Sequence, residues 1–169
     1  QAVEALKEGK EPSLDDVLST QSEIELRVPA LLPEDYIGDV NTRLSLYKKL
    51  ASCKNSTEIK ELQVELIDRF GLLPDAAKNL VRVSEMKLIA QVAGIRKLGA
   101  SAQGGTIEFT EKTSVDPGFI IRLIQRKPDV FRFDGPQKLR FTKATDSADK
   151  RMNFVSALLN DFKQQVKAA

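Results

Sequence analysis

The spacing of apolar residues predicts five amphipathic helices along the chain. In these segments apolar side chains recur at every third or fourth position, which is the period of one helical face. The last helix has Phe154, Leu158 and Phe162 on one side. The predicted helices cover 40–51, 55–70, 74–93, 116–127 and about 146–166.

Polar residues, glycine and proline mark where these helices begin and end. Asp39 is suited to cap the first helix, and Asn55 with Glu58 resembles a capping box for the second. Gly71 fits a left-handed stop after the second helix, and Pro74 fits the first turn of the third. Three consecutive helices with short connections are therefore expected.

The same periodicity predicts which side chains the helices bury. A buried position is expected wherever an apolar residue falls on the common stripe. The residues expected to face inward are Val40, Leu44, Tyr47 and Ala51 in the first helix, Leu62, Leu66, Ile67 and Phe70 in the second, Leu80, Leu88 and Val92 in the third, and Phe119, Ile120, Leu123 and Ile124 in the fourth.

Alternation with a period of two predicts strands. Residues 24–28 alternate apolar and charged side chains before Pro29, and residues 94–110 form a hairpin around Gly104 and Gly105. A second hairpin covers 130–142 and turns at 134–136. Together with the helices, this order predicts an α+β fold with a small, mostly antiparallel sheet of two hairpins plus an N-terminal strand, packed with about five helices.

Composition narrows the classes of function. The chain has 169 residues, is 41% hydrophobic and 30% charged, and has no apolar run long enough to span a bilayer. It lacks histidine, and Cys53 is its single cysteine, so a Cys/His zinc site, an internal disulfide and a Ser-His-Asp triad are excluded. Residues 1–22 read as a helix end and linker entering from an upstream domain, and 23–169 as one domain. We expect a non-catalytic, monomeric, cytoplasmic segment without a metal or cofactor of its own.

The basic half of the chain raises the question of nucleic-acid binding. Residues 91–169 hold 14 Lys and Arg against 8 Asp and Glu, whereas residues 1–90 hold 12 against 16. Arg122, Arg126 and Lys127 are the candidate contacts in the basic half. Phosphate binding requires such cations to converge, preferably with exposed aromatic residues. Phe131, Phe133 and Phe141 are, however, interpreted as core residues of strands.

Neither glycine pairs nor carboxylate clusters predict a catalytic centre. Gly104–Gly105 lacks the GxxxxGK[ST] or GxGxxG pattern of a phosphate loop and is interpreted as a hairpin turn. Glu61, Glu65 and Asp68 form a stripe at i, i+4 and i+7 on the second helix. The stripe is either ordinary solvated surface or a docking edge for arginines of a partner.

Four segments resemble one known family, the C-terminal domain of bacterial transcription-repair coupling factors. They are LPEDYIGDVNTRLSLYKKLA (32–51), ELIDRFGLLP (65–74), GGTIEF (104–109) and DGPQKLRF (134–141). The similarity covers about 23–143, and the first two segments are the specific ones. Residues 1–22 resemble the segment that links the motor of these proteins to this domain.

The resemblance implies a regulatory role inside a longer protein. The parent is implied to be an ATP-driven translocase on double-stranded DNA that acts on stalled RNA polymerase and recruits UvrA, the excinuclease A subunit. The C-terminal domain is implied to dock on an N-terminal module similar to excinuclease B, hiding its UvrA-binding surface and restraining the motor. Stripe geometry and the ELIDRFG match together make Glu61, Glu65 and Asp68 the predicted docking residues, with Glu61 outside the motif.

Overall fold

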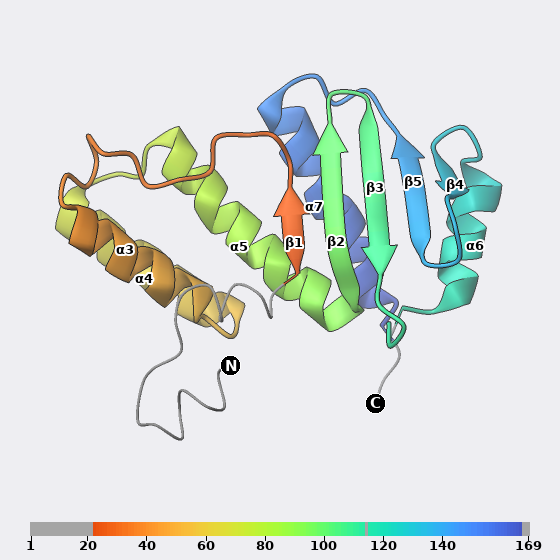
Figure 1. Ribbon diagram of the computed structural model, residues 1–169, viewed down its shortest axis with the longest axis horizontal. Coiled ribbons are helices and arrows are strands. Elements are labelled where there is room, and N and C mark those ends of the chain that lie inside the picture. The colour runs from red at the N-terminus through yellow and green to blue at the C-terminus, as the bar shows by residue number, and fades with distance from the viewer. Residues whose placement is uncertain (1–21, 114, 167–169) are drawn as a thin grey trace. The chain divides into compact units, whose positions relative to one another are not determined.

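The computed structural model describes residues 22–113 and 115–166 (Figure 1). The predicted linker therefore falls, except for Ser22, outside the described residues. The α+β class with a mostly antiparallel sheet is confirmed. The elements are β1 (Glu23–Glu25), α3 (Val40–Ala51), α4 (Ser56–Phe70), α5 (Asp75–Ala93), β2 (Ile95–Ser101), β3 (Gly104–Phe109), α6 (Pro117–Arg126), β4 (Phe131–Phe133), β5 (Lys138–Thr142) and α7 (Ala148–Gln164).

The described residues belong to two compact units, and α5 contributes to both. The helical unit holds residues 29–88, and the sheet unit holds 22–28 with the described residues from 89 onward. The expectation of one domain over 23–169 stays a prediction. No helix within the described ranges is long and apolar enough to cross a membrane.

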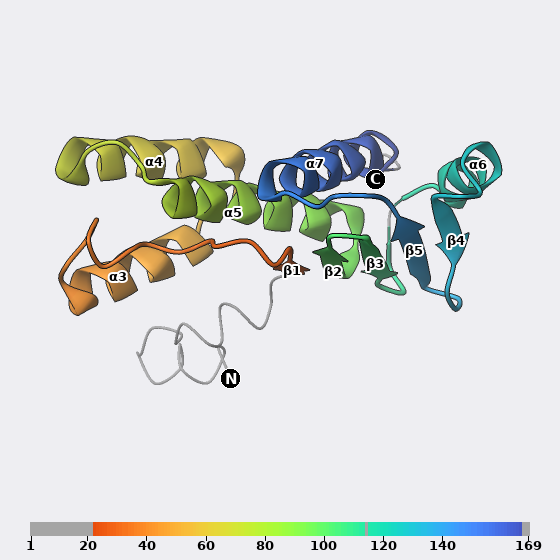
Figure 2. The same cartoon turned by 90° about the horizontal axis from the view of Figure 1, so that it is seen from above.

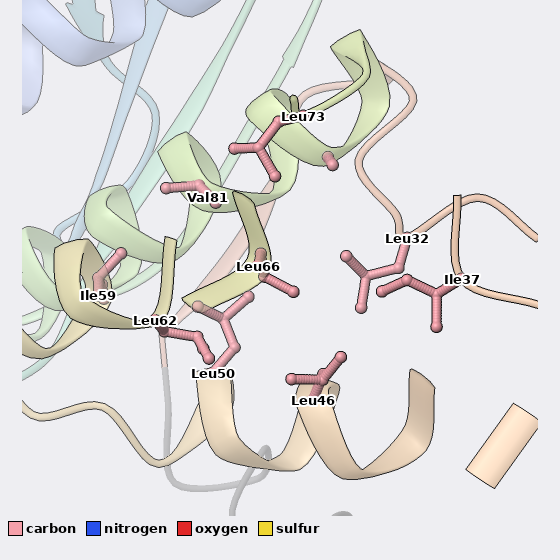
Figure 3. Packing of buried hydrophobic residues seen from close by; sticks show 10 residues of the cluster. Leu32, Ile37, Leu46, Leu50, Ile59, Leu62, Leu66, Leu73 and Val81 are labelled. Atoms are coloured by element: carbon pink, nitrogen blue, oxygen red, sulfur yellow. The ribbon is translucent and has the colours of Figure 1, made fainter. Parts of the chain in front are cut away.

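The helical unit packs α3, α4 and the first turns of α5 around one apolar core (Figure 3). The predicted caps are confirmed: Asp39 accepts from the Thr42 N–H, and Asn55 accepts from the Glu58 N–H. The predicted capping box differs in its second bond: the Glu58 carboxylate accepts from the Lys54 N–H at 3.1 Å, one residue before the N-cap residue Asn55. The core residues are Leu32, Ile37, Leu46, Leu50, Ile59, Leu62, Leu66, Leu73, Ala77 and Val81.

The prediction of which α3 residues face the core is wrong for the first half of the helix. Val40 is 56% exposed and Leu44 is 51% exposed, whereas Leu46 and Leu50 are buried. The helix turns its C-terminal half toward the core, where the Tyr47 hydroxyl accepts from the Leu32 N–H at 2.7 Å. The apolar stripe alone did not reveal that the first turns lie beyond the core.

The third helix follows its predicted pattern except at its end. Leu80 and Leu88 pack partly buried against the core of the helical unit. Val92 was expected to be buried and is 56% exposed. In α4, by contrast, Leu62 and Leu66 are buried as predicted.

The sheet unit contains five strands in the order β1-β2-β3-β5-β4. β1 pairs with β2 in parallel, and the other pairs are antiparallel. β1 is shorter than the predicted 24–28, although Leu26 beyond it is still buried. The helix α7 covers one face of the sheet (Figure 2). Its Val155, Leu158, Leu159 and Phe162 are buried.

The first hairpin turns at Ala102–Gln103, which corrects the predicted turn at the two glycines. Ser101 pairs with Gly104, so both glycines lie inside β3. A Cβ on Gly105 would lie 1.9 Å from the Gly99 carbonyl oxygen, and one on Gly104 would lie 2.2 Å from that of Phe141. Gly104 also has φ +139°, which side-chain-bearing residues rarely adopt. The glycines therefore serve close strand packing.

A buried arginine joins the two chain segments of the sheet unit. Arg151 of α7 is only 7% exposed. Its guanidinium donates to the carbonyls of Leu26 (2.9 Å), Arg27 (3.2 Å) and Thr145 (2.9 and 3.2 Å). Because burying an unpaired charge is costly, these carbonyls are what permits Arg151 to be buried.

Replacing Gly105 with alanine is expected to destabilise the chain by about 1–3 kcal/mol, because backbone atoms must shift to admit the Cβ. Gly38→Ala is the control, since the nearest atom to its Cβ would be 3.9 Å away. Urea unfolding followed by circular dichroism measures the free energy of unfolding of both variants. An equal loss for Gly105→Ala and Gly38→Ala would contradict the packing role of Gly105.

Arg151→Met is expected to cost about 2–4 kcal/mol, because it removes charged hydrogen bonds from buried carbonyls. Arg151→Lys, which keeps the charge without the planar fork, should fall between Arg151→Met and wild type. The neighbouring Lys150→Met removes only an exposed pair with Asp146 and should cost less than about 1 kcal/mol. Urea unfolding again measures the free energy of unfolding. Similar losses of this free energy for Arg151→Met and Lys150→Met would contradict a stabilising role of the hydrogen bonds from Arg151 to the carbonyls.

Candidate docking surface on helix α4

The helix α4 buries most of its apolar residues and presents a largely polar face to solvent. Ile59, Leu62 and Leu66 are buried against the core, as Figure 3 shows. Glu61 and Asp68 are exposed on the other side. Val64 lies between them and is 57% exposed. The outer face of α4 thus carries two exposed carboxylates and the apolar side chain of Val64, with the exposed Lys60 one turn before Val64.

Glu65 differs from its two neighbours because it is held by two cations. Its carboxylate accepts from Lys49 of α3 at 2.7 Å and from Arg69 of α4 at 3.1 Å. These hydrogen bonds lower the pKa of the Glu65 carboxyl below its usual value of 4.5. Glu61 and Asp68 form no ion pair with any described residue. The structure therefore places the three predicted residues on one helix but leaves only two as free charges.

A hollow of about 340 Å³ lies between α3 and α4, beside the Lys49–Glu65 pair. Its lining is rich in carboxylates. Cys53 lies in it, and burial, followed by the charge of Glu58, raises the pKa of its thiol. A raised pKa disfavours the reactive thiolate, as expected for an inert cysteine. The lining residues are Lys49, Ser52, Cys53, Glu58, Glu61, Leu62 and Glu65.

The end of α4 is held by a tyrosine from the turn before α3. The Tyr36 hydroxyl lies 2.8 Å from the Gly71 carbonyl oxygen and 3.2 Å from that of Leu66, and donates to them. Gly71 has φ +95°, as expected for a glycine stop. Leu72 follows and is 85% exposed. The sequence did not indicate that Leu72 is exposed or that Lys49 pairs with Glu65. The pair between Glu65 and Arg69 could have been predicted from their i, i+4 spacing on the helix.

The alternative candidates lie on the sheet unit. Arg122 and Arg126 are one turn apart on the exposed side of α6, and Lys127 follows as its C-cap residue. None of the three forms an ion pair with a described residue. Over the described ranges, no group of His, Cys, Asp or Glu side chains is arranged to hold a metal ion.

Comparison with known proteins identifies the family. A family model described as the TRCF domain matches residues 26–120. The chain belongs to this family. The TRCF domain here is 53% identical over 158 residues to a transcription-repair-coupling factor of Haemophilus influenzae, and 48% identical over 167 residues to that of Escherichia coli.

The alignments with these two proteins cover 94% and 99% of this chain but only 14% of each relative. A solved structure titled as the C-terminal domain of transcription-repair coupling factor has the same fold, with a TM-score of 0.67 and 24% identity. The matched region comprises 87% of this chain and 98% of the solved chain. The resemblance to this C-terminal domain is confirmed, and it ties this TRCF domain to transcription-coupled DNA repair.

The ion pairs of Glu65 predict a stability difference that depends on pH. Because its pKa is lowered on folding, Glu65 stabilises the fold above its usual pKa of 4.5 and loses this contribution as the pH falls below it. Glu65→Gln should therefore cost up to about 1 kcal/mol at pH 7 and less at pH 3.

Urea unfolding of wild type and Glu65→Gln at both pH values measures this difference. Glu61→Gln is the control at pH 7, where it should change the free energy of unfolding by less than about 0.5 kcal/mol. A Glu65→Gln deficit that persists unchanged at low pH would contradict the ion-pair origin.

Proposed function

We propose that this TRCF domain is a non-catalytic regulatory module that docks through the outer face of α4. Its partner is the N-terminal excinuclease-B-like module of the same, longer protein. Docking hides the UvrA-binding surface of that module and restrains the translocase until stalled RNA polymerase is engaged. The observation that carries the proposal is the exposed pair Glu61 and Asp68 on either side of Glu65, which is ion-paired within the domain.

The Lys49–Glu65–Arg69 group supports docking by holding the helix in place. A bridge from α3 to α4 restricts how the two helices move relative to each other. Glu61, Val64 and Asp68 are thereby presented on a constrained surface, which lowers the ordering cost of binding. Arginines of a partner suit such carboxylates, since they can bind them through two parallel hydrogen bonds.

The structure changes the weight of the three predicted contacts. Glu65 is already neutralised within the domain, so it is proposed to position α4 rather than to supply the main docking charge. Asp68 and Glu61 take that role, with Val64 and the exposed Leu72 available for apolar contact. Each exposed charge pair contributes only about 0–1 kcal/mol. Such an interface suits a switch whose open state must stay accessible.

The activities of the longer protein are extended to this chain only as proposals. They are ATP-driven movement on double-stranded DNA and contact with RNA polymerase and UvrA. These 169 residues contain no GxxxxGK[ST] pattern, so the motor that would bind ATP is proposed to belong to another part of the longer protein. The domain itself is proposed to act as a monomer in the cytoplasm, with no cofactor of its own.

Reversal of Glu61 and Asp68 to arginine is expected to weaken docking at least tenfold, because two attractive contacts become repulsive. Titration calorimetry of the chain with its cognate N-terminal module measures this. Glu65→Gln should weaken docking less than the double reversal, because Glu65 is proposed to position α4 and not to contact the partner directly. Glu34→Arg is the matched control, because Glu34 is an exposed acid of the same unit outside α4.

Two results would count against the proposal. Binding that tolerates the double reversal as well as Glu34→Arg would place the contact elsewhere. Absence of binding up to about 1 mM would rule out docking, since a flexible tether supplies only about that effective concentration.

A further inference from the structure

Two arginines lie directly opposite each other on the sheet. Arg132 of β4 pairs in register with Arg140 of β5. Like charges at directly opposed positions destabilise a sheet. Lys138 adds a third cation on the same face, two residues from Arg140 along β5. The hairpin therefore gathers three cations on one face.

Only one of the two arginines is neutralised within the chain. Arg140 donates to the Asp134 carboxylate at 2.6 Å. Arg132 is exposed and forms no ion pair or side-chain hydrogen bond with a described residue. The Asp134 carboxylate also attracts Arg132 over a longer distance. The hairpin therefore presents one hydrogen-bonded guanidinium beside one that has no direct partner among the described residues.

Helix α6 brings further cations to the same edge of the sheet. β4 is the last strand in the sheet order, and α6 lies beside it (Figures 1 and 2). The Phe131 N–H donates to the Lys127 carbonyl at 2.9 Å, so the end of α6 is tied to the start of β4. Residues 117–143 hold seven Lys and Arg against two Asp and Glu.

Phe133 adds an exposed aromatic ring to this edge. It was expected to be a core residue, together with Phe131 and Phe141. Phe131 is 3% exposed and Phe141 is 1% exposed, but Phe133 is 54% exposed. The core prediction is wrong for Phe133 because β4 is the edge strand, and its side chain lies at the rim.

We propose that this basic edge, comprising Arg122, Arg126, Lys127, Arg132 and Phe133, binds single-stranded nucleic acid. The cations would neutralise successive phosphates. Phe133 would stack against a base, since every base offers a planar face. Arg132 and Phe133 are adjacent on a strand and point to opposite sides, so one polynucleotide crossing the edge can reach both. An acidic peptide would satisfy the cations but not the exposed ring.

The test is fluorescence anisotropy of a labelled oligothymidylate titrated with the 169-residue chain. Binding is expected at low salt, weakening roughly tenfold or more between about 50 and 200 mM salt if three phosphates are contacted. Arg126→Gln with Arg132→Gln should lower the slope of log K against log salt by about 1.4. Phe133→Ala should weaken binding at least about fivefold without changing that slope.

Lys163→Gln is the matched control, because Lys163 is an exposed cation of the sheet unit on α7. It should leave affinity and slope unchanged, and circular dichroism confirms that each variant is folded. No binding at low salt would overturn the proposal. If Phe133→Ala left the affinity for the oligothymidylate unchanged, and a polyglutamate of matched charge competed with it equally well, the edge would instead be assigned to an acidic peptide. Neither result bears on docking through α4, which has its own measurement.

Discussion

The buried guanidinium of Arg151 is the interaction on which the sheet unit depends. This unit is built from two stretches of chain, 22–28 and 89 onward, that are separated by the whole helical unit in sequence. Arg151 binds the carbonyls that follow β1 and the one at Thr145 before α7. These hydrogen bonds hold the segment after β1 against the start of α7. They also stabilise the backbone at Arg27, whose φ of +53° is unusual for a residue with a side chain.

Close strand packing is the second constraint, and it acts at the other side of β2. Gly104 and Gly105 bring β3 against both β2 and β5, since neither neighbour leaves room for a Cβ. That packing sets the register of β5, and β5 in turn sets the register of β4. The opposition of Arg132 and Arg140 therefore follows from the pairing of the strands, and the position of the basic edge depends on glycines two strands away.

The two proposed surfaces are built in the same way. On α4, Glu65 is ion-paired with Lys49 and Arg69, whereas the charges of Glu61 and Asp68 beside it have no ion-pair partner among the described residues. On the hairpin, Arg140 is ion-paired with Asp134, whereas Arg132 beside it forms no ion pair with a described residue. In each case an internal ion pair lies next to a like charge that has no ion-pair partner among the described residues. The acidic surface belongs to the helical unit and the basic one to the sheet unit, so a protein partner and a nucleic acid need not compete for one site.

Local chemistry was sufficient for the sequence to determine the helices, their caps at Asp39 and Asn55, the glycine stop at Gly71 and the family. These features depend on residues within a few positions of one another. Only the tertiary structure decided that Val40 and Leu44 face solvent, that Gly104 and Gly105 lie within a strand, and that Phe133 is exposed. It also decided that Glu65 is neutralised by Lys49, sixteen residues away. Each of these outcomes depends on what another segment places next to the residue, and a linear pattern of apolar and charged positions does not contain that information.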